Sequence, residues 1–312
     1  MTDRRALHGV LLLDKPLGWT SNDALQKCKG LLRALKGGHT GTLDPLATGL
    51  LPLAFGAATK FSQASLESDK RYLATLHLGR RTSSGDLEGE VIEERAVTCT
   101  AADIAAACQR FAGPQQQCPP MLSALKHRGR ALYDWARDGV EVEREPRDVT
   151  VHAIHVVDWQ PPLLTLDVRC SKGTYIRTLA EDIGAALGCG AHLAALRRTG
   201  CGLLDLADAI GIEAFAALDA DARERRLLPP QALLADWPSI TLPATDAARF
   251  LTGLRRRVAV DDAEQLRVLG PDGAFLGSAH VAAGELIADR LLNPDEVRAV
   301  ANLTHPAPGV PA

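Results

Sequence analysis

The sequence predicts an α+β protein of two domains, because helix and strand patterns are interspersed over about 240 residues and only short strands follow them. A chain of 312 residues is long enough for two domains of roughly 150 residues each. Prolines cluster in residues 227–243, which we interpret as a linker. The predicted domains are therefore residues 1–240 and a small, mostly β domain at residues 241–312.

The first predicted elements are a buried strand at residues 9–13 and a helix that begins after Thr20. Thr20 and Asp23 have the spacing of a capping box, in which each residue accepts a hydrogen bond from the backbone of the other. We expect one face of this helix to pack against the core. Its apolar stripe consists of Ala24, Cys28, Leu31, Leu32 and Leu35.

Further elements follow from hydrophobic periodicity. Residues 70–79 and 164–170 alternate between apolar and polar side chains as strands do, and Tyr72 lies at the start of the first strand. Residues 101–112 form a predicted helix behind a capping threonine. Helical spacing over residues 176–187 places Arg177 in the first turn of another helix, just after a strand.

Charge and cysteine content argue against several functional classes. The 35 Lys and Arg and 38 Asp and Glu leave a net charge of -3, so a nucleic-acid partner would need a local basic patch. The seven cysteines are scattered without a CxxC pair, which argues against a disulfide framework or a thiolate zinc site. The apolar run at residues 9–13 is too short for a signal peptide or a membrane span. We expect a cytoplasmic protein without a membrane segment.

The stretch GGHTGTLDPLATGLLP, residues 37–52, contains one acid, Asp44. An Asp-Pro pair among glycines is most often a turn in which the carboxylate caps nearby amides. The surrounding leucines would instead desolvate the carboxylate, which would then need a cationic partner to stay ionised. Arg177 is a candidate partner, because a guanidinium group matches a carboxylate with two donors. The stretch alone leaves both interpretations open.

Four motifs, in one order and at consistent spacings, resemble those of the bacterial TruB family of tRNA pseudouridine synthases. They are GGHTGTLDPLATGLLPLAFGAATKF, DKRYLATLHLGRRTSSGDLEG, CSKGTYIRTLAEDIG and GCGAHLAALRRTG. The similarity covers most of residues 8–210 and includes KPLGWTSND and PPMLSALKHRGRALYDWARDG. It implies a catalytic domain built on a mixed, mainly antiparallel sheet with flanking helices, followed by a PUA-like RNA-binding domain.

The resemblance implies isomerisation of uridine 55 in the T loop of tRNA to pseudouridine, with the base flipped out of its stack. Asp44 matches the family's nucleophile, which attacks the nucleoside so that uracil is detached, rotated and reattached through carbon. Tyr72 matches a tyrosine that stacks on the base, and Arg177 matches the arginine that pairs with the aspartate. No metal or cofactor is implied. Attack on the pyrimidine ring and attack on the ribose both remain open.

Other positions match residues to which the family assigns binding or support. The matched binding residues are Tyr175, Leu196 and His39, the last of which helps to hold the splayed T loop. The matched support residues are Lys15 and Pro16 of a KPxG motif and Asp86, an acid near the arginine.

A basic run between residues 122 and 133 contains no acid. Such a run is usually a solvated face, but in this family it falls in an insertion, here about residues 119–150, that closes over the RNA stem. The RNA-binding candidates in the insertion are Lys126, Arg128 and Arg130. Further candidates for phosphate contacts are Arg197, Arg198 and residues 255–257.

Two other functions share these features. A tRNA-folding chaperone would use the same unstacking of the elbow, and the two activities are compatible. Guide-RNA-directed relatives share the GHxGxLDPxATG core, but the basic insertion and the short tail favour direct recognition of the stem. We therefore expect a monomer that acts on the T arm and elbow of tRNA with no obligatory protein or guide RNA.

Overall fold

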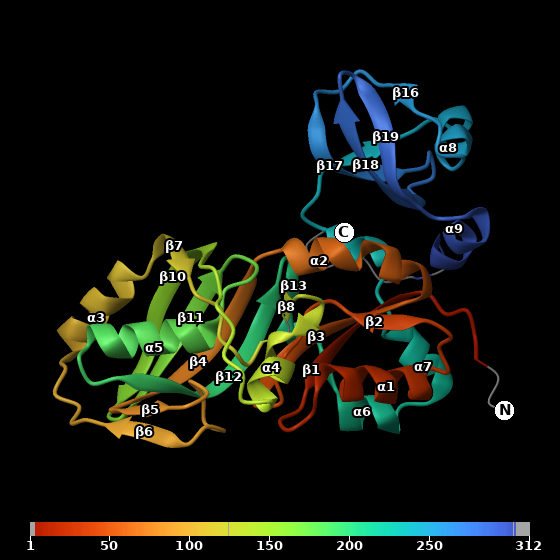
Figure 1. Ribbon diagram of the computed structural model, residues 1–312. Coiled ribbons are helices and arrows are strands. Elements are labelled where there is room, and N and C mark those ends of the chain that lie inside the picture. The colour runs from red at the N-terminus through yellow and green to blue at the C-terminus, as the bar shows by residue number, and fades with distance from the viewer. Residues whose placement is uncertain (1–3, 124, 302, 304–312) are drawn as a thin grey trace. The chain divides into compact units, whose positions relative to one another are not determined.

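The computed structural model describes residues 4–123, 125–301 and 303, and the chain divides into two compact units. The first unit comprises residues 1–45, 49–67 and 200–312, and the second comprises residues 46–48 and 68–199. Both units combine strands with helices (Figure 1), which confirms the predicted α+β class. Residues 304–312 of the predicted C-terminal domain lie outside the described part of the chain.

The first unit is organised around the pairing of β1 (Gly9–Lys15) with β3 (Ala47–Phe55). The two strands are antiparallel from Gly9 opposite Phe55 to Lys15 opposite Gly49. β14 (Ile210–Gly211) pairs with β1 in parallel, and β2 (Gly37–His39) pairs antiparallel with the far end of β3. The sheet is thus mixed and mainly antiparallel, as the resemblance implies. The helices beside it are α1 (Ser21–Leu31), α2 (Ser62–Glu67), α6 (Ile212–Ala217) and α7 (Ala220–Arg225).

The start of α1 confirms the predicted capping box, whereas its end differs from the prediction. The Thr20 hydroxyl accepts a hydrogen bond from the Asp23 N–H at 3.1 Å, and the Asp23 carboxylate accepts one from the Thr20 N–H at 3.1 Å. Cys28 is buried as expected, but Leu35 is 59% exposed. The reason is that Arg33 takes a left-handed conformation with φ 51°, which ends the helical path before Leu35.

The short strands predicted near the C-terminus form a separate five-stranded sheet. Its order is β15 (Ser239–Thr241), β17 (Ala263–Leu269), β18 (Phe275–Ala282), β19 (Glu285–Leu291) and β16 (Arg256–Arg257). Two helices accompany it, α8 (Ala244–Phe250) and α9 (Pro294–Ala301). The sheet has its own core, which includes Phe250, Val268 and Leu286. That this part is a distinct RNA-binding domain stays a prediction.

The segment predicted as a linker, residues 227–243, is partly buried instead. Leu228 exchanges two backbone hydrogen bonds of 2.8 Å with Val10, and Leu227 is 1% exposed. The short helical turn η3 (Pro230–Leu234) adds Leu233 and Leu234 to the core of the first unit. The interpretation as a linker is therefore wrong for residues 227–234, because the leucines between the prolines bury apolar surface.

The second unit contains a row of five strands covered on one face by two helices (Figure 1). The order is β12 (Ala191–Cys201), β4 (Lys70–Leu78), β11 (Leu163–Cys170), β10 (Arg147–Gln160) and β7 (Gly113–Gln117). β12 continues into the first unit at Gly200 and pairs there with β13 (Leu204–Asp205). The covering helices are α3 (Ala101–Arg110) and α5 (Ile176–Ala186), both at the predicted places. Two hairpins extend from this unit, β5 (Arg80–Thr82) with β6 (Val91–Glu94), and β8 (Lys126–His127) with β9 (Arg130–Ala131).

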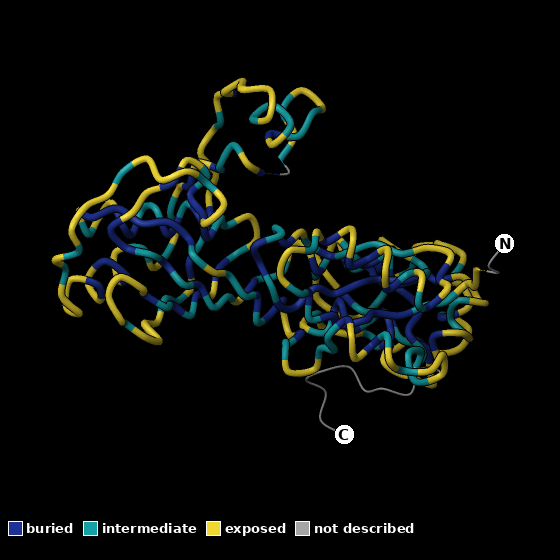
Figure 2. Tube along the Cα trace, turned by 90° about the horizontal axis from the view of Figure 1, so that it is seen from below, coloured by how far each residue is buried: buried dark blue, intermediate teal, exposed yellow. Residues whose placement is uncertain are grey.

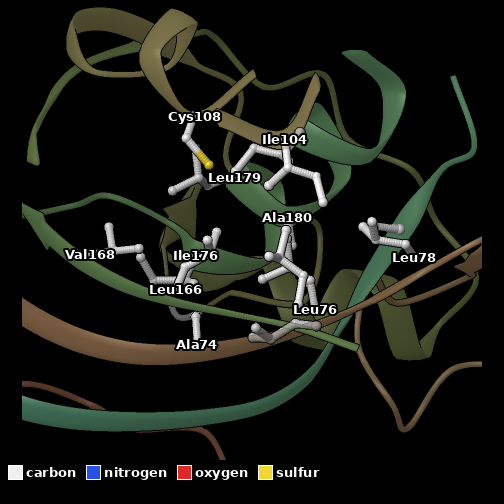
Figure 3. Close-up of a cluster of buried hydrophobic side chains, with 14 of the residues drawn as sticks. Ala74, Leu76, Leu78, Ile104, Cys108, Leu166, Val168, Ile176, Leu179 and Ala180 are labelled. Atoms are coloured by element: carbon white, nitrogen blue, oxygen red, sulfur yellow. The ribbon is translucent and has the colours of Figure 1, made fainter. Parts of the chain in front are cut away.

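The core of the second unit confirms the predicted periodicities. Leu76 of β4 and Leu166 of β11 point toward Leu179 of α5 and Ile104 of α3 (Figure 3), and each of the four is at most 1% exposed. The alternation read from the sequence therefore marks the face of each strand that carries the helices. In Figure 2 the buried segments, in dark blue, lie mostly inside each unit, and the exposed segments, in yellow, lie mostly at its periphery. The turn of the β8–β9 hairpin, residues 128–129, is exposed.

We predict that Gly184→Ala and Gly30→Ala change stability in opposite directions, although both glycines lie in helices. A Cβ added at Gly184 of α5 would lie 2.3 Å from the backbone nitrogen of Ala191, so the helix must move away, at a cost of roughly 1–3 kcal/mol. A Cβ at Gly30 of α1 meets nothing within 4 Å, and alanine should stabilise that helix by up to about 1 kcal/mol. Urea unfolding of both variants tests this, and equal stabilisation would refute the close approach of α5 to Ala191.

Candidate active site

Asp44 lies in the first unit, in the segment that joins β2 to β3, and it is half-buried. Leu43, directly before it, is 4% exposed. Leu50, Leu51 and Leu53 of the following strand are fully buried. Asp44 is thus flanked in the sequence by buried apolar residues, and the desolvation of its carboxylate stays a prediction.

Lys15 and Pro16, the residues matched to a support motif, form the turn between β1 and α1. The Lys15 side chain is fully buried, and its ammonium group donates hydrogen bonds to the carbonyl oxygens of Trp19 at 2.5 Å and Pro16 at 3.0 Å. A buried ammonium requires such acceptors. Lys15 therefore stabilises this turn by hydrogen bonds to two of its carbonyl groups.

Arg177 and Asp86 form a buried ion pair in the second unit. Arg177 lies in the first turn of α5, as predicted, and its Nη1 is 3.3 Å from Oδ2 of Asp86. The two side chains are 7% and 4% exposed. Asp86 sits in the connection of the β5–β6 hairpin, where its Oδ1 also accepts hydrogen bonds from the Ser84 hydroxyl at 2.5 Å and the Glu88 N–H at 3.1 Å. The proximity of acid and arginine that the resemblance implies is present.

Arg177 also reaches the insertion. Its Nη2 donates a hydrogen bond of 2.5 Å to the carbonyl oxygen of Leu122, and its Nη1 lies 3.5 Å from the carbonyl oxygen of Ser84. The guanidinium group is planar, so contacts to both of its terminal nitrogens set its orientation. One arginine therefore ties α5 to the β5–β6 connection and to the base of the insertion.

Two other ionisable groups near this pair are shifted by burial. Burial raises the pKa of Glu181, one turn along α5 from Arg177, while the nearby Arg81 acts against that rise. Burial lowers the pKa of His192, whose ring stacks on that of His77 with centroids 5.2 Å apart. Burial therefore favours the uncharged form of the His192 imidazole.

Tyr72, Leu196 and Tyr175 occupy three different elements of the second unit. Tyr72 pairs with Val168 across β4 and β11 and is partly buried against the core. Leu196 of β12 packs against the same core. Tyr175 immediately precedes α5, and its backbone N–H and carbonyl are both bonded to the side-chain amide of the buried Gln117, at 2.7 and 3.1 Å. Sequence reasoning missed Gln117, because its partner is 58 positions away.

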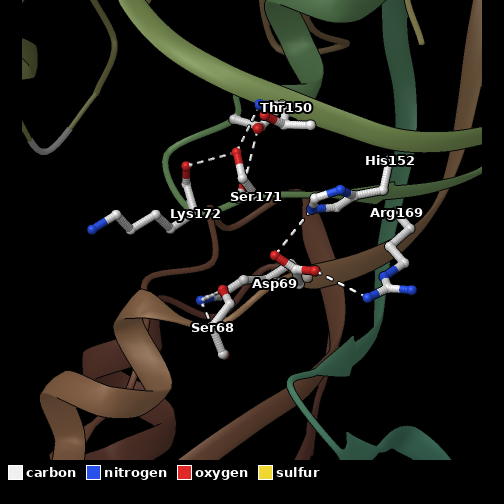
Figure 4. Close-up of polar contacts among 9 residues, drawn as sticks. Ser68, Asp69, Thr150, His152, Arg169, Ser171 and Lys172 are labelled. Carbon is white, nitrogen blue, oxygen red and sulfur yellow. Dashed lines mark hydrogen bonds and ion pairs between the residues drawn. The ribbon is translucent and has the colours of Figure 1, made fainter. Parts of the chain in front are cut away.

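Asp69 fixes the start of the strand that carries Tyr72. Figure 4 shows its carboxylate between His152 of β10 and Arg169 of β11, each 3.1 Å away. The side chain of Asp69 is 36% exposed and that of Arg169 is 62% exposed, so the pair is screened by water. The contact joins three neighbouring strands at one edge.

His39 ends β2 in the first unit, where it lies opposite Leu53 of β3. Asp44 belongs to the same unit, whereas Tyr72 and Arg177 belong to the second. The pairing of Asp44 with Arg177, and the shared pocket that the resemblance implies, therefore stay predictions.

The basic run of the insertion forms the β8–β9 hairpin. Lys126 and Arg128 are exposed, and Arg128 takes a left-handed conformation at the turn with φ 50°. Arg130 is held within the protein, since it pairs with Asp138 at 2.6 Å and stacks over Trp135 at 4.8 Å from the ring centre. Its charge is thus partly compensated, which favours a structural contribution from Arg130.

A cavity of about 420 Å³ lies beside this hairpin. It is lined by charged residues of both signs, among them Lys126, Glu143 and Arg144.

Two of the other arginines predicted to contact phosphates are held within the protein. Arg198 is 1% exposed and is not available at the surface. Arg256 pairs with Asp246 and its side chain is only 9% exposed.

Within the described ranges, no cluster of three or more His, Cys, Asp or Glu side chains could hold a metal ion. No helix there is long and apolar enough to cross a membrane. The cysteines of the described part are free, and burial raises the pKa of the Cys28 and Cys170 thiols to about 12. Both are therefore protonated at neutral pH and are poor nucleophiles.

Solved structures with a similar fold include a Cbf5-Nop10-Gar1 complex. The match has a TM-score of 0.73 at 23% sequence identity and covers 93% of this chain and 86% of the other. An H/ACA RNP bound to a substrate RNA containing 2′-deoxyuridine gives a TM-score of 0.71 at 22% identity, with 93% and 86% coverage. At this identity the likeness concerns the fold alone.

Curated relatives are much closer in sequence. A tRNA pseudouridine synthase B from Burkholderia mallei is 54% identical over 296 residues, which is 93% of this chain and 98% of the relative. One from Cupriavidus pinatubonensis is 55% identical over 300 residues, with 93% and 95% coverage. The TruB family pseudouridylate synthase N-terminal domain matches residues 29–176, and two TruB C-terminal domains match residues 177–235 and 238–292. The chain therefore belongs to the TruB family of pseudouridine synthases.

Proposed function

We propose that this protein isomerises uridine 55 in the T loop of tRNA to pseudouridine, with Asp44 as the nucleophile. The observation that carries the reaction is an identity of 54–55% to tRNA pseudouridine synthases over 93% of the chain. The protein acts in the cytoplasm as a monomer on the T arm and elbow of tRNA, and it needs no protein partner, guide RNA or cofactor. The same unstacking of the elbow lets it assist tRNA folding.

The chemistry needs few protein groups. The target base is taken out of its stack at a cost of a few kcal/mol, and Tyr72 offers a face on which it stacks in return. Asp44 attacks the nucleoside, uracil is detached and rotated, and a carbon–carbon bond to the ribose replaces the carbon–nitrogen bond. The proton on carbon 5 of the base is released, N1 of the base takes up a proton in its place, and the bond to Asp44 breaks so that the carboxylate is regenerated. The product is an isomer of the substrate, so no water or redox partner is consumed.

Arg177 has the features of a group that keeps a nucleophilic carboxylate ionised. It is buried, which strengthens its field, and its orientation is fixed by Asp86 and the Leu122 carbonyl. In this proposal Tyr175, Leu196 and His39 contact the flipped nucleoside or the T loop, while Lys15, Pro16 and Asp86 support the site. The exposed Lys126 and Arg128 contact phosphates of the RNA stem.

Asp44→Asn should abolish the reaction and leave binding of tRNA nearly intact. Asparagine has the same shape as aspartate but is neutral and a poor nucleophile. The measurement is tritium release from carbon 5 of uridine in an unmodified tRNA transcript, with pseudouridine mapped to position 55 and with no other protein or RNA added. Product from the variant would exclude Asp44 as nucleophile. Binding without product from the parent chain would favour a chaperone or a guide-dependent enzyme.

Arg177→Ala should lower turnover sharply and shift the acidic limb of the pH–rate profile to higher pH. Without the cation the pKa of Asp44 rises, so a smaller fraction of the carboxylate is ionised at a given pH and the rate recovers as the pH is raised. Single-turnover rates between pH 5 and 9 test this. Arg95→Ala is the matched control, since Arg95 is exposed and pairs with Glu93. A near-normal profile for Arg177→Ala would remove the arginine from the mechanism.

Asp86→Asn should cost about 3–5 kcal/mol of unfolding free energy, because it breaks a buried ion pair by removing one of its two charges. Asp69→Asn removes the same kind of acid from a pair with arginine, but that pair is exposed and should contribute at most about 1 kcal/mol. Urea unfolding of both variants at pH 7 gives the comparison. Equal losses would contradict the support role of Asp86.

A further inference from the structure

Residues 40–45, the segment that ends at Asp44 and Pro45, are anchored at three points. The Thr40 N–H donates to the carbonyl oxygen of Pro52 at 3.1 Å. Both backbone groups of Leu43 are bonded to the Ser21 side chain. The Gly18 N–H donates to the carbonyl oxygen of Pro45 at 2.8 Å. The first, fourth and sixth residues are therefore fixed, and Asp44 lies between two of the anchors.

Ser21 makes the contact nearest to Asp44. Its hydroxyl oxygen accepts a hydrogen bond from the Leu43 N–H at 2.8 Å and its hydroxyl donates to the Leu43 carbonyl oxygen at 3.1 Å. Ser21 is 3% exposed, so water cannot replace these bonds without opening the structure. The Ser21 side chain thus bonds to both backbone groups of Leu43, as a neighbouring strand would in a sheet.

Ser65 of α2 holds the other end of the segment through Thr40. Its hydroxyl donates to Thr40 Oγ1 at 2.9 Å and lies 3.3 Å from Cys201 Sγ, and Thr40 Oγ1 also lies 3.4 Å from the Pro52 carbonyl oxygen. Thr40, Ser65 and Cys201 are 0%, 3% and 2% exposed. Buried hydroxyls are costly unless they are bonded, so this small network specifies one position for Thr40.

The neighbouring residue Thr20 has a different task. Its hydroxyl caps α1 by accepting from the Asp23 N–H at 3.1 Å and donating to the Asp23 carboxylate at 2.6 Å. The adjacent hydroxyls of Thr20 and Ser21 therefore have different partners at the start of α1. Thr20 stabilises the helix, and Ser21 points away from the cap to the segment of Asp44.

We propose that Ser21 and Ser65 are positioning residues that hold the segment 40–45 and thereby set the direction of the Asp44 carboxylate. This inference rests on the proposed role of Asp44 as nucleophile. A nucleophile must meet the reacting atom within a few tenths of an ångström, and a shift of about 1 Å can cost a hundredfold in rate. Ser21 acts through the backbone of Leu43 and Ser65 through the side chain of Thr40. They therefore affect the chemical step and leave the surface that binds tRNA unchanged.

The test compares Ser21→Ala with Thr20→Ala. Ser21→Ala should lower kcat roughly tenfold to a hundredfold, while the dissociation constant for tRNA stays unchanged. Thr20→Ala removes the helix cap, so it should lower Tm but leave kcat at 25 °C near that of the parent chain. If Ser21 served only to stabilise α1, both variants would lose Tm and keep kcat, and that outcome would overturn the proposal.

Ser65→Ala tests the proposal independently, and it does so even if Ser21→Ala does not fold. It should lower kcat with unchanged tRNA binding. Ser62→Ala on the same helix should not lower kcat, because the Ser62 hydroxyl donates to the carbonyl oxygen of Thr59 and not to the segment 40–45. Asp44→Asn is measured alongside. An active Asp44→Asn variant would defeat the proposed function itself. An inactive Asp44→Asn variant together with normal kcat for Ser65→Ala would defeat only the positioning of the segment by Ser65.

Discussion

The antiparallel pairing of β1 with β3 is the constraint on which the part of the first unit that carries Asp44 depends. It fixes Lys15 at one end of β1 and, through Pro52 in the middle of β3, the first residue of the segment that carries Asp44. Pro52 has no N–H to offer a neighbouring strand, but its carbonyl oxygen accepts from the Thr40 N–H. The leucines of β3 thus pack in the core, and its backbone binds the segment that carries Asp44.

The elements that were predictable from the sequence are those with local signals. The capping box of α1 needs only Thr20 and Asp23, and the strands β4 and β11 are visible as alternation because one face is buried. β3 was missed because its residues are buried on both faces and include Gly49 and Pro52, so neither alternation nor strand propensity marks it. Residues 227–234 were interpreted as a linker because of their prolines, whereas the leucines beside those prolines pack into the core.

The candidate site shows the same division between local and distant information. The motifs predict roles for Asp44, Arg177 and Asp86, and the structure joins the last two in an ion pair. The contacts of Ser21 with Leu43 and of Gln117 with Tyr175 join positions 22 and 58 apart, and no local pattern announces them. Such residues are ordinary serines and glutamines until the fold supplies their partners.

A single carboxylate suits the proposed isomerisation only if its direction is fixed before tRNA arrives. Cofactor enzymes bring a reactive group whose own chemistry lowers the barrier, whereas here position and electrostatics must do so. In this proposal the need is met by the buried hydrogen bonds of Ser21 with both backbone groups of Leu43 and of Ser65 with the Thr40 hydroxyl. A buried arginine oriented by Asp86 adds to them. These groups are buried, so their contacts hold their geometry better than equivalent surface bonds. In this proposal the buried serines preorganise the carboxylate by acting through their neighbours in the segment 40–45.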